Sequence, residues 1–177
     1  VAAAPIGSAA ILSISSMYIA LMGASGLADA SAMAVLNANY LIALVKDVYE
    51  VPHGDCCMHE FVACAKTLRR TRKISAMDIA KRLLDYGFHT PAMSFPAPGT
   101  LMSVPTESER KDELDRFCDA MIAIREEIRA IEDGRMPRED NPLKNAPHTA
   151  LDLAEDNWSR PYTRRQACFP AALSAHN

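Results

Sequence analysis

The sequence predicts an α+β domain in which helices pack on a small antiparallel or mixed sheet. Its 177 residues are 49% hydrophobic, which is enough for a buried core of substantial size. Apolar residues recur with helical spacing in several stretches, and short β-prone segments bounded by Pro and Gly lie between them. We divide the chain into a helical segment, a small α+β domain and an extended C-terminal arm, at residues 1–48, 49–134 and 135–177.

Charge and cysteine content narrow the classes of partner. The formal net charge of −3 and the isoelectric point near 6.0 give no overall attraction for nucleic acid. The basic cluster at residues 66–73 contains no aromatic residue that could stack on bases, so we expect a solvated turn there. Five cysteines in irregular spacing argue against a disulfide framework and indicate a reducing compartment. We expect no nucleic-acid partner.

The first segment begins without an initiator methionine or a basic leader, so no signal or transit peptide is visible. It contains two helical patterns separated by Gly23 and Gly26. Its longest uninterrupted apolar run, Met17 to Met22, is far too short to span a bilayer. We therefore expect buried protein here and no membrane contact.

The second helical pattern should be covered on nearly all sides. Apolar residues follow one another at steps of three or four along one face, which makes it a packing face. Three further apolar residues, Leu36, Ala43 and Leu44, widen that face almost all round. The residues of the face are Ala34, Ala38, Leu41, Val45 and Val48.

Two β-prone stretches are expected to form the sheet. Residues 49–64 have Pro52 and Gly54 between apolar pieces, a pattern typical of a short hairpin. Residues 99–104 follow a segment whose prolines forbid a helix, and their composition suits a short strand. Together they predict a sheet of few strands.

Two helices of the middle segment have clear start signals. The first, residues 76–86, is preceded by Ser75 and Asp78 at capping-box spacing. Before the second, Thr106 and Glu109 have the same spacing and predict another capping box. The apolar stripe of the second helix and the glycine that ends it are Leu114, Phe117, Met121, Ile124, Ile128, Ile131 and Gly134.

The last segment is rich in Pro, Asn and charge. Its aromatic residues Trp158, Tyr162 and Phe169 are spaced apart, a pattern typical of an extended arm. We expect these three side chains to lie on the surface of a partner.

Candidate chemistry is sparse. The possible zinc ligands are His53, Cys56, Cys57 and His59. Adjacent cysteines on a strand point to opposite faces, and no second ligand pair follows, so we predict no metal site. His89 is the most informative polar residue, because it lies in an irregular segment where functional groups are often displayed. It contacts a ligand or binds the loop backbone, and the residues alone leave both readings open.

Five motifs follow one another along the chain: "APIGSAAILSIS", "YGFHTPAMSFP", "PTESE", "NAPHT" and "RPYTRRQACFP". In this order they resemble the C-terminal portion of glycine decarboxylase, the P-protein of the glycine cleavage system. The resemblance covers the chain from its start to about Pro170. That family belongs to the fold-type I pyridoxal-phosphate enzymes, of which this chain would form the small C-terminal domain.

The resemblance implies decarboxylation of glycine and transfer of the remaining aminomethyl group to the lipoyl arm of H-protein. Pyridoxal phosphate would be the cofactor, held by a lysine upstream of Val1, because no segment here resembles the family's lysine-bearing loop. This chain would therefore hold no catalytic residue and would not catalyse alone. The candidates for contacting the substrate or the lipoyl arm are His89, Ser94, Gly7 and Ser8.

The implied partners are the upstream, cofactor-binding part of the same enzyme and the lipoyl-bearing H-protein, in a homodimer or heterotetramer. The implied compartment is the mitochondrial matrix in a eukaryote and the cytoplasm otherwise.

Four positions depart from the family's usual pattern. Ala92 stands where a threonine is usual, and Val104 replaces an acid. Cys64 and Lys66 stand where the family tends to have Asp and Arg, and lysine is a poor substitute for an arginine in a bidentate pair. Of these departures, Val104, Cys64 and Lys66 favour the alternative function, a non-catalytic oligomerisation or H-protein docking module derived from the family.

Overall fold

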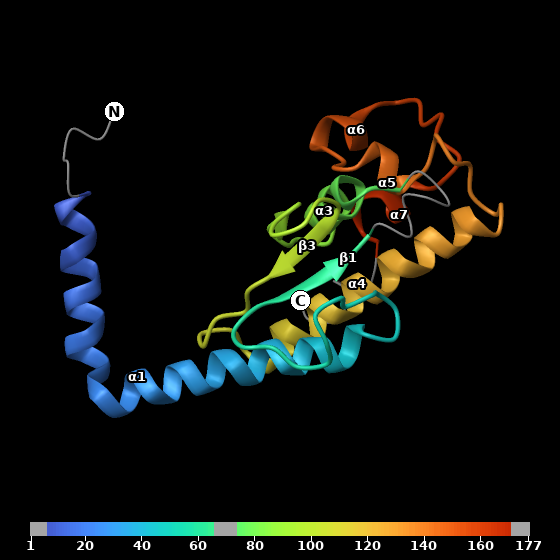
Figure 1. Ribbon diagram of the computed structural model, residues 1–177. Coiled ribbons are helices and arrows are strands. Elements are labelled where there is room, and N and C mark those ends of the chain that lie inside the picture. Colours follow the sequence, from blue (N-terminus) through green and yellow to red (C-terminus); the bar gives the residue numbers. More distant parts are fainter. Residues whose placement is uncertain (1–6, 66–73, 171–177) are drawn as a thin grey trace.

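The computed structural model of the chain describes residues 7–65 and 74–170 (Figure 1). Helices surround a small antiparallel sheet, which confirms the α+β class expected from the sequence. The basic cluster at residues 66–73 lies outside the described residues. In chain order the elements are α1 (Ala9–Val45), β1 (Phe61–Cys64), α3 (Ala76–Asp85), β2 (Ala92–Met93), β3 (Thr100–Ser103), α4 (Lys111–Glu132), α5 (Pro142–Asn145), α6 (Ala150–Ala154) and α7 (Arg164–Cys168).

The sheet has the strand order β1-β3-β2, and both pairs are antiparallel. The hairpin expected over residues 49–64 is reduced to a single bridge between Glu50 and Cys64. The intervening loop is instead fastened to α1, because the Asn39 side chain accepts a hydrogen bond from the Cys57 N–H at 3.0 Å and donates one to the Cys57 carbonyl at 2.8 Å. β1 therefore takes β3 as its main partner.

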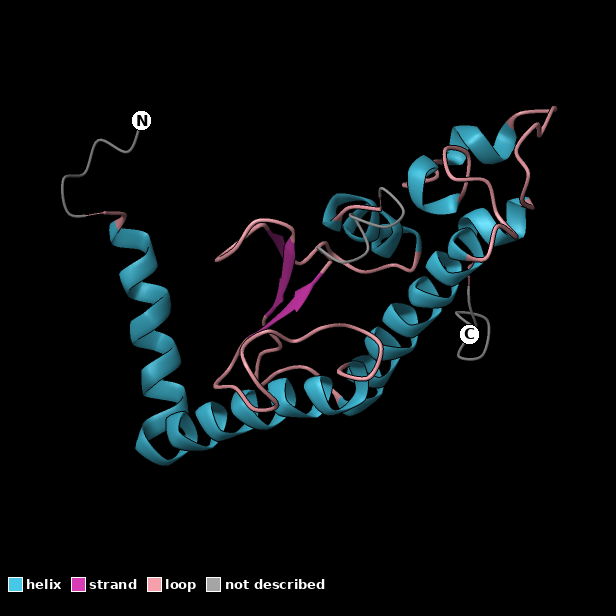
Figure 2. Cartoon of the chain, turned by 45° about the vertical axis from the view of Figure 1, so that its right-hand side comes forward, coloured by secondary structure: helices cyan, strands magenta, loops and turns pink. Residues whose placement is uncertain are grey.

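α1 is broken at Gly23, whose φ of 63° and ψ of −178° are non-helical. Because a positive φ favours glycine, this residue explains the predicted break, whereas Gly26 stays inside the helix. The part after Gly23 runs beside α4, and the part before it, residues 9–22, is called here the N-terminal arm. Figures 1 and 2 both show this arm pointing away from the sheet.

The N-terminal arm exposes apolar side chains, among which Leu12 is 70% and Leu21 is 83% exposed. Leu36, on the second part of α1, is 61% exposed. The burial expected for this segment is therefore not provided by the described residues. By length and composition α1 could cross a membrane, which the count of uninterrupted apolar residues did not anticipate. This is a weak indication, because the core helix of a soluble protein meets the same criterion.

α3 and α4 carry most of the core against the second part of α1 and the sheet. The capping box of α3 is confirmed: the Ser75 hydroxyl accepts a hydrogen bond from the Asp78 N–H at 3.3 Å, and the Asp78 carboxylate accepts one from the Ser75 N–H at 2.7 Å. Gly134, with a φ of 75°, follows the end of α4 as predicted. The buried residues of the predicted stripe are Leu114, Met121, Ile124, Ile128 and Ile131.

The second capping box, predicted from Thr106 and Glu109, is wrong. α4 begins only at the second residue after Glu109 and has no side-chain cap. The Thr106 carbonyl instead accepts a hydrogen bond from the buried Asn37 side chain of α1 at 2.8 Å. Tyr18 of the N-terminal arm donates to the Glu107 carboxylate at 2.7 Å. The segment is thus a turn that these two bonds tie to α1.

The chain after α4 folds back onto α3, where Figure 1 shows α5, α6 and α7 gathered. Arg82 of α3 is fully buried at this contact. Its guanidinium donates to the carboxylates of Asp85 and Glu127 at 2.9 and 2.6 Å. It also donates to the carbonyls of Gln166 and Ala167 at 2.6 and 2.7 Å. One side chain therefore fastens the C-terminal segment to the domain.

His148 extends this contact. Its Nδ1 lies 2.8 Å from the Asp85 carboxylate, and its Nε2 lies 3.0 Å from the Tyr162 hydroxyl. Tyr162 is only 3% exposed and Trp158 donates to its carbonyl, whereas Phe169 is exposed. The prediction that these aromatics lie on a partner surface is therefore wrong for Tyr162, which packs within its own chain. The set called here the Arg82 cluster is Arg82, Asp85, Glu127, His148 and Tyr162.

Candidate functional site

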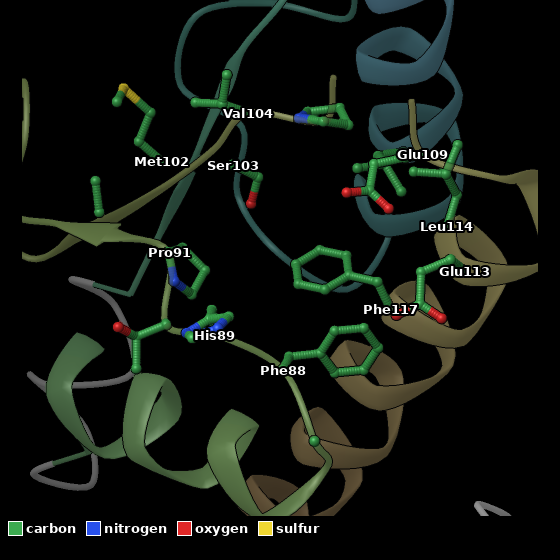
Figure 3. Close-up of a pocket in the computed structure, with 15 residues that line it drawn as sticks. Phe88, His89, Pro91, Met102, Ser103, Val104, Glu109, Glu113, Leu114 and Phe117 are labelled. Carbon is green, nitrogen blue, oxygen red and sulfur yellow. The ribbon is translucent and has the colours of Figure 1, made fainter. Parts of the chain in front are cut away.

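A cavity of about 450 Å³, called here the pocket, opens between the sheet, the start of α4 and the segment that follows α3 (Figure 3). Nine of its fifteen lining residues are apolar, which makes it suited to a ligand with an apolar body. β3 contributes Met102 and Ser103, and the segment after α3 contributes Phe88 and His89. The short strands and the proline-rich connector therefore shape one wall of the pocket.

Two aromatic rings form another wall. Phe88 and Phe117 meet edge to face, with ring centroids 5.4 Å apart and an interplanar angle of 84°. The Arg116 guanidinium lies 3.8 Å from the centroid of the Phe88 ring. This packing fixes the ring of Phe88 and occupies one of its faces.

Glu113 lines the pocket, but its charge is matched inside the chain. The Arg116 guanidinium donates to its carboxylate at 2.5 and 2.9 Å and to the Tyr86 carbonyl at 3.0 Å. The hydrogen bonds from Arg116 hold the pKa of Glu113 below its ordinary value. Glu113 is therefore ionised at neutral pH and already paired.

Three other polar side chains of the pocket have no hydrogen-bond or ion-pair partner in the described chain. Ser103 is 8% exposed, and Figure 3 shows its hydroxyl directed into the pocket. Glu109 and His89 are exposed at the rim, and the Glu109 carboxylate also points inward in that view. Within residues 7–65 and 74–170, none of the three side chains makes a hydrogen bond or an ion pair. A hydroxyl, a carboxylate and an imidazole are thus available to a ligand.

Of the site residues predicted from the sequence, only His89 lines the pocket. Ser94 lies in the turn between β2 and β3, with a φ of 57°, and its hydroxyl accepts a hydrogen bond from the Gly99 N–H at 3.3 Å. This geometry gives Ser94 a role in holding the turn. The prediction that it meets a ligand stays a prediction.

Gly7 and Ser8 stand at the start of the N-terminal arm, which points away from the sheet (Figure 1), and neither residue lines the pocket. Gly7 has a φ of 95°, and Ser8 occupies the N-cap position of α1 without a side-chain cap bond. Both are exposed. The structure therefore does not bring them together with His89.

Sequence reasoning missed Ser103 and Glu109. Glu109 was assigned to a capping box that does not form, and Ser103 looked like an ordinary strand residue. A usable signal was present, however, because Ala92 and Val104, two of the departures from the family pattern, both line the pocket. A third departure, Cys64, is buried in β1, and the fourth, Lys66, lies outside the described residues.

The residues of the pocket do not fit pyridoxal phosphate. That cofactor needs a lysine for its imine and donors for a phosphate dianion. The lining residues within 7–65 and 74–170 include no lysine or arginine, and two carboxylates face the space. Elsewhere in the described chain, Lys111 pairs with Asp115 and Lys144 with Asp78.

The four possible zinc ligands are not arranged around a common point that a metal ion could occupy. His53, Cys56 and Cys57 border a second, smaller cavity of about 170 Å³, while His59 is paired with Glu60 at 3.8 Å. Within residues 7–65 and 74–170, no three His, Cys, Asp or Glu side chains are placed to hold a metal ion.

Comparison with known proteins gives a consistent result. Residues 30–148 match the family described as "Glycine dehydrogenase, C-terminal domain". Glycine dehydrogenase (decarboxylating) of Vibrio vulnificus strain YJ016 is 55% identical over 98% of the chain, and that of Rhizobium meliloti strain 1021 is 56% identical over 96%. The protein of the same description from Nitrobacter winogradskyi is 54% identical over 98%. The chain spans only 18–19% of the length of these relatives.

Proposed function

Because the chain belongs to the family of glycine dehydrogenase C-terminal domains, we propose that it forms one wall of an active site that decarboxylates glycine. The observation that carries this proposal is the pocket, in which Ser103, His89 and Glu109 present polar groups without a partner in the described chain. Unsatisfied polar groups beside an apolar cavity are typical of a ligand site. In the longer enzyme the remaining aminomethyl group passes to the lipoyl group of H-protein.

The cofactor of this reaction is pyridoxal phosphate, which supplies the electron sink when carbon dioxide leaves. Its lysine is placed in the larger part of the enzyme, because the described residues of the pocket include no lysine and no arginine. The exposed apolar side chains of the N-terminal arm support a contact with that larger part, since apolar surface of this kind usually marks an interface. The chain alone is inactive in this proposal.

The partners that follow are the rest of the enzyme and the lipoyl-bearing H-protein, in a homodimer or heterotetramer. Neither nucleic acid nor a membrane is part of the proposal, and α1 is assigned to contact with protein. The compartment is the mitochondrial matrix if the source is a eukaryote and the cytoplasm otherwise.

One observation favours a second candidate, a non-catalytic module for oligomerisation or H-protein docking. Ala92 and Val104 both line the pocket, and each lacks a polar group that the family usually has there. A pocket with fewer polar groups is suited to holding an apolar arm without reacting with it.

A chimera separates the two candidates. This chain replaces the corresponding C-terminal region of the Vibrio vulnificus relative, and incorporation of labelled bicarbonate into glycine is measured. The catalytic proposal expects exchange within about tenfold of the unaltered relative, a barrier change of about 1.4 kcal/mol. A folded chimera that binds normal amounts of pyridoxal phosphate and still gives no exchange contradicts it. Binding of H-protein by that silent chimera supports the docking module.

A further inference from the structure

The polar groups of the pocket that lack a partner in the described chain favour a ligand with a positive charge. Glu109 is the carboxylate without an ion-pair partner among the described residues, whereas Glu113 is neutralised by Arg116. Among the described residues that line the space, His89 is the single basic side chain. A ligand anion would therefore face two carboxylates, while a ligand cation would find one that is free.

The body of the pocket is mostly apolar, and its volume is large enough for an alkyl chain. Its lining includes Leu41, Leu114, Met102 and the two phenylalanine rings. A cavity of about 450 Å³ is far larger than glycine needs, and the carboxylate of glycine would find no lysine or arginine among the described lining residues. The Ser103 hydroxyl, nine-tenths buried and directed inward, offers one polar contact beyond the rim.

We propose that the pocket binds a primary alkylammonium group carried on an apolar stem, with Glu109 as its counter-ion. This rests on the proposed function, where the aminomethylated dihydrolipoyl arm of H-protein has this chemistry: an aliphatic chain that ends in a thioether-bonded CH₂–NH₃⁺ group. The pocket thus recognises the product-bearing arm in preference to glycine. Glu109 contacts the ammonium, and the apolar walls cover the stem.

The chain itself can be tested with simple probes of equal length: hexylamine, hexan-1-ol and sodium hexanoate. The readout is the NMR signal of the Met102 methyl group in ¹³C-methyl-methionine protein, assigned with the Met102→Leu variant. Hexylamine should shift this signal and bind about tenfold more tightly than hexan-1-ol, because a charge-assisted hydrogen bond is added. Hexanoate should bind most weakly. Equal affinity for hexylamine and hexanoate, or an unshifted Met102 signal, overturns the proposal.

Two matched variants assign the effect to a residue. Glu109→Gln should reduce hexylamine affinity to that of hexan-1-ol. Glu107→Gln removes the same charge from the same turn, but Glu107 binds Tyr18 and does not line the pocket, so it should keep the preference. Unchanged amide spectra show that both variants are folded. A preference that survives Glu109→Gln contradicts the assignment.

The chimera distinguishes a failure of this inference from a failure of the proposed function. In an active chimera, Glu109→Gln should raise about tenfold the KM for aminomethylated H-protein in the reverse, glycine-forming direction, and leave the KM for glycine in the forward direction unchanged. An active chimera whose KM for aminomethylated H-protein is unaffected overturns the inference alone. A silent chimera overturns the catalytic function, and the probe titrations on the 177-residue chain still decide whether the pocket selects a cation.

Discussion

The Arg82 cluster and the pocket are built from the same kinds of group and have opposite properties. Each contains a carboxylate, a histidine and a hydroxyl: Asp85, His148 and Tyr162 in the cluster, and Glu109, His89 and Ser103 in the pocket. In the cluster these groups bind one another and Arg82 with little exposure to solvent. In the pocket, none of the three has a partner among the described residues.

The difference separates a structural site from a ligand site. A buried polar group without a hydrogen bond costs about 1–3 kcal/mol, so a cluster that only stabilises the fold must be saturated. Groups that face an open cavity stay hydrated, so they can remain without a protein partner at little cost in folding free energy. Mutations should therefore affect stability in the cluster and binding in the pocket.

The largest effect is expected from Arg82→Met. It leaves the carboxylates of Asp85 and Glu127 without their guanidinium and frees the carbonyls of Gln166 and Ala167. Breaking a buried pair in this way costs about 3–5 kcal/mol, measured as the free energy of unfolding in urea. Arg110→Met, which removes an exposed partner of Asp112, should cost less than about 1 kcal/mol. Equal losses of unfolding free energy in the two variants would contradict a special structural role for the Arg82 cluster.

Tyr162→Phe should give the next largest effect within the cluster. Its hydroxyl lies 3.0 Å from His148 Nε2 and accepts hydrogen bonds from Asn145 and Arg160 at 2.9 and 3.1 Å. Losing them should cost about 1–2 kcal/mol of unfolding free energy and should make the C-terminal segment easier to cleave by protease. A variant as stable as the parent would show that this hydroxyl is not needed.

Val104→Glu should change binding without changing stability. Val104 is 45% exposed on the rim, so a carboxylate can be placed there with a stability change of less than about 0.5 kcal/mol. A second free carboxylate should raise hexylamine affinity about threefold, an effect reduced by salt. Ala92→Thr, also on the rim, is the neutral control. Tighter binding of hexanoate by Val104→Glu would contradict the cation preference.

The smallest effect concerns Glu113, whose pKa is lowered by its bonds to Arg116. Its stabilising contribution is present above the unfolded-state pKa of about 4.3 and is lost as pH falls through the lower folded-state value. Glu113→Gln should therefore be less stable than the parent at pH 7 by less than about 1 kcal/mol. The two should become equally stable in acid. A stability difference between Glu113→Gln and the parent that grows on acidification would contradict a stabilising bond between Glu113 and Arg116.

Local patterns determined much of the fold before the structure was considered. The capping box of α3, the apolar stripe of α4 and the glycine break in α1 depend on neighbours in sequence and were predicted correctly. The second capping box failed because the Thr106 hydroxyl bonds to the Ser108 hydroxyl, while Asn37, 69 residues away, ties the Thr106 carbonyl to α1. The C-terminal segment was misread because a buried arginine in α3 gives it a partner within its own chain.

The candidate site was less predictable. His89 was chosen as a candidate because of its irregular, proline-rich surroundings, and the structure places it in the lining of the pocket. Sequence gave no reason to choose His89 over His148, which also stands beside a proline and yet is fully satisfied. Ser103 and Glu109 become a pair only when β3 and the start of α4 meet around one cavity. Such meetings depend on tertiary packing, which local spacing does not encode.

The central claim is that the cofactor chemistry resides in polypeptide outside this chain, while the chain supplies the pocket. The direct test is to incubate the purified 177-residue chain with pyridoxal phosphate, reduce with borohydride and measure by mass spectrometry how much cofactor is fixed to each lysine. We predict no stoichiometric labelling of any single lysine and no carbon dioxide release from glycine. One lysine labelled to completion, in a chain that then decarboxylates glycine unaided, would contradict the account.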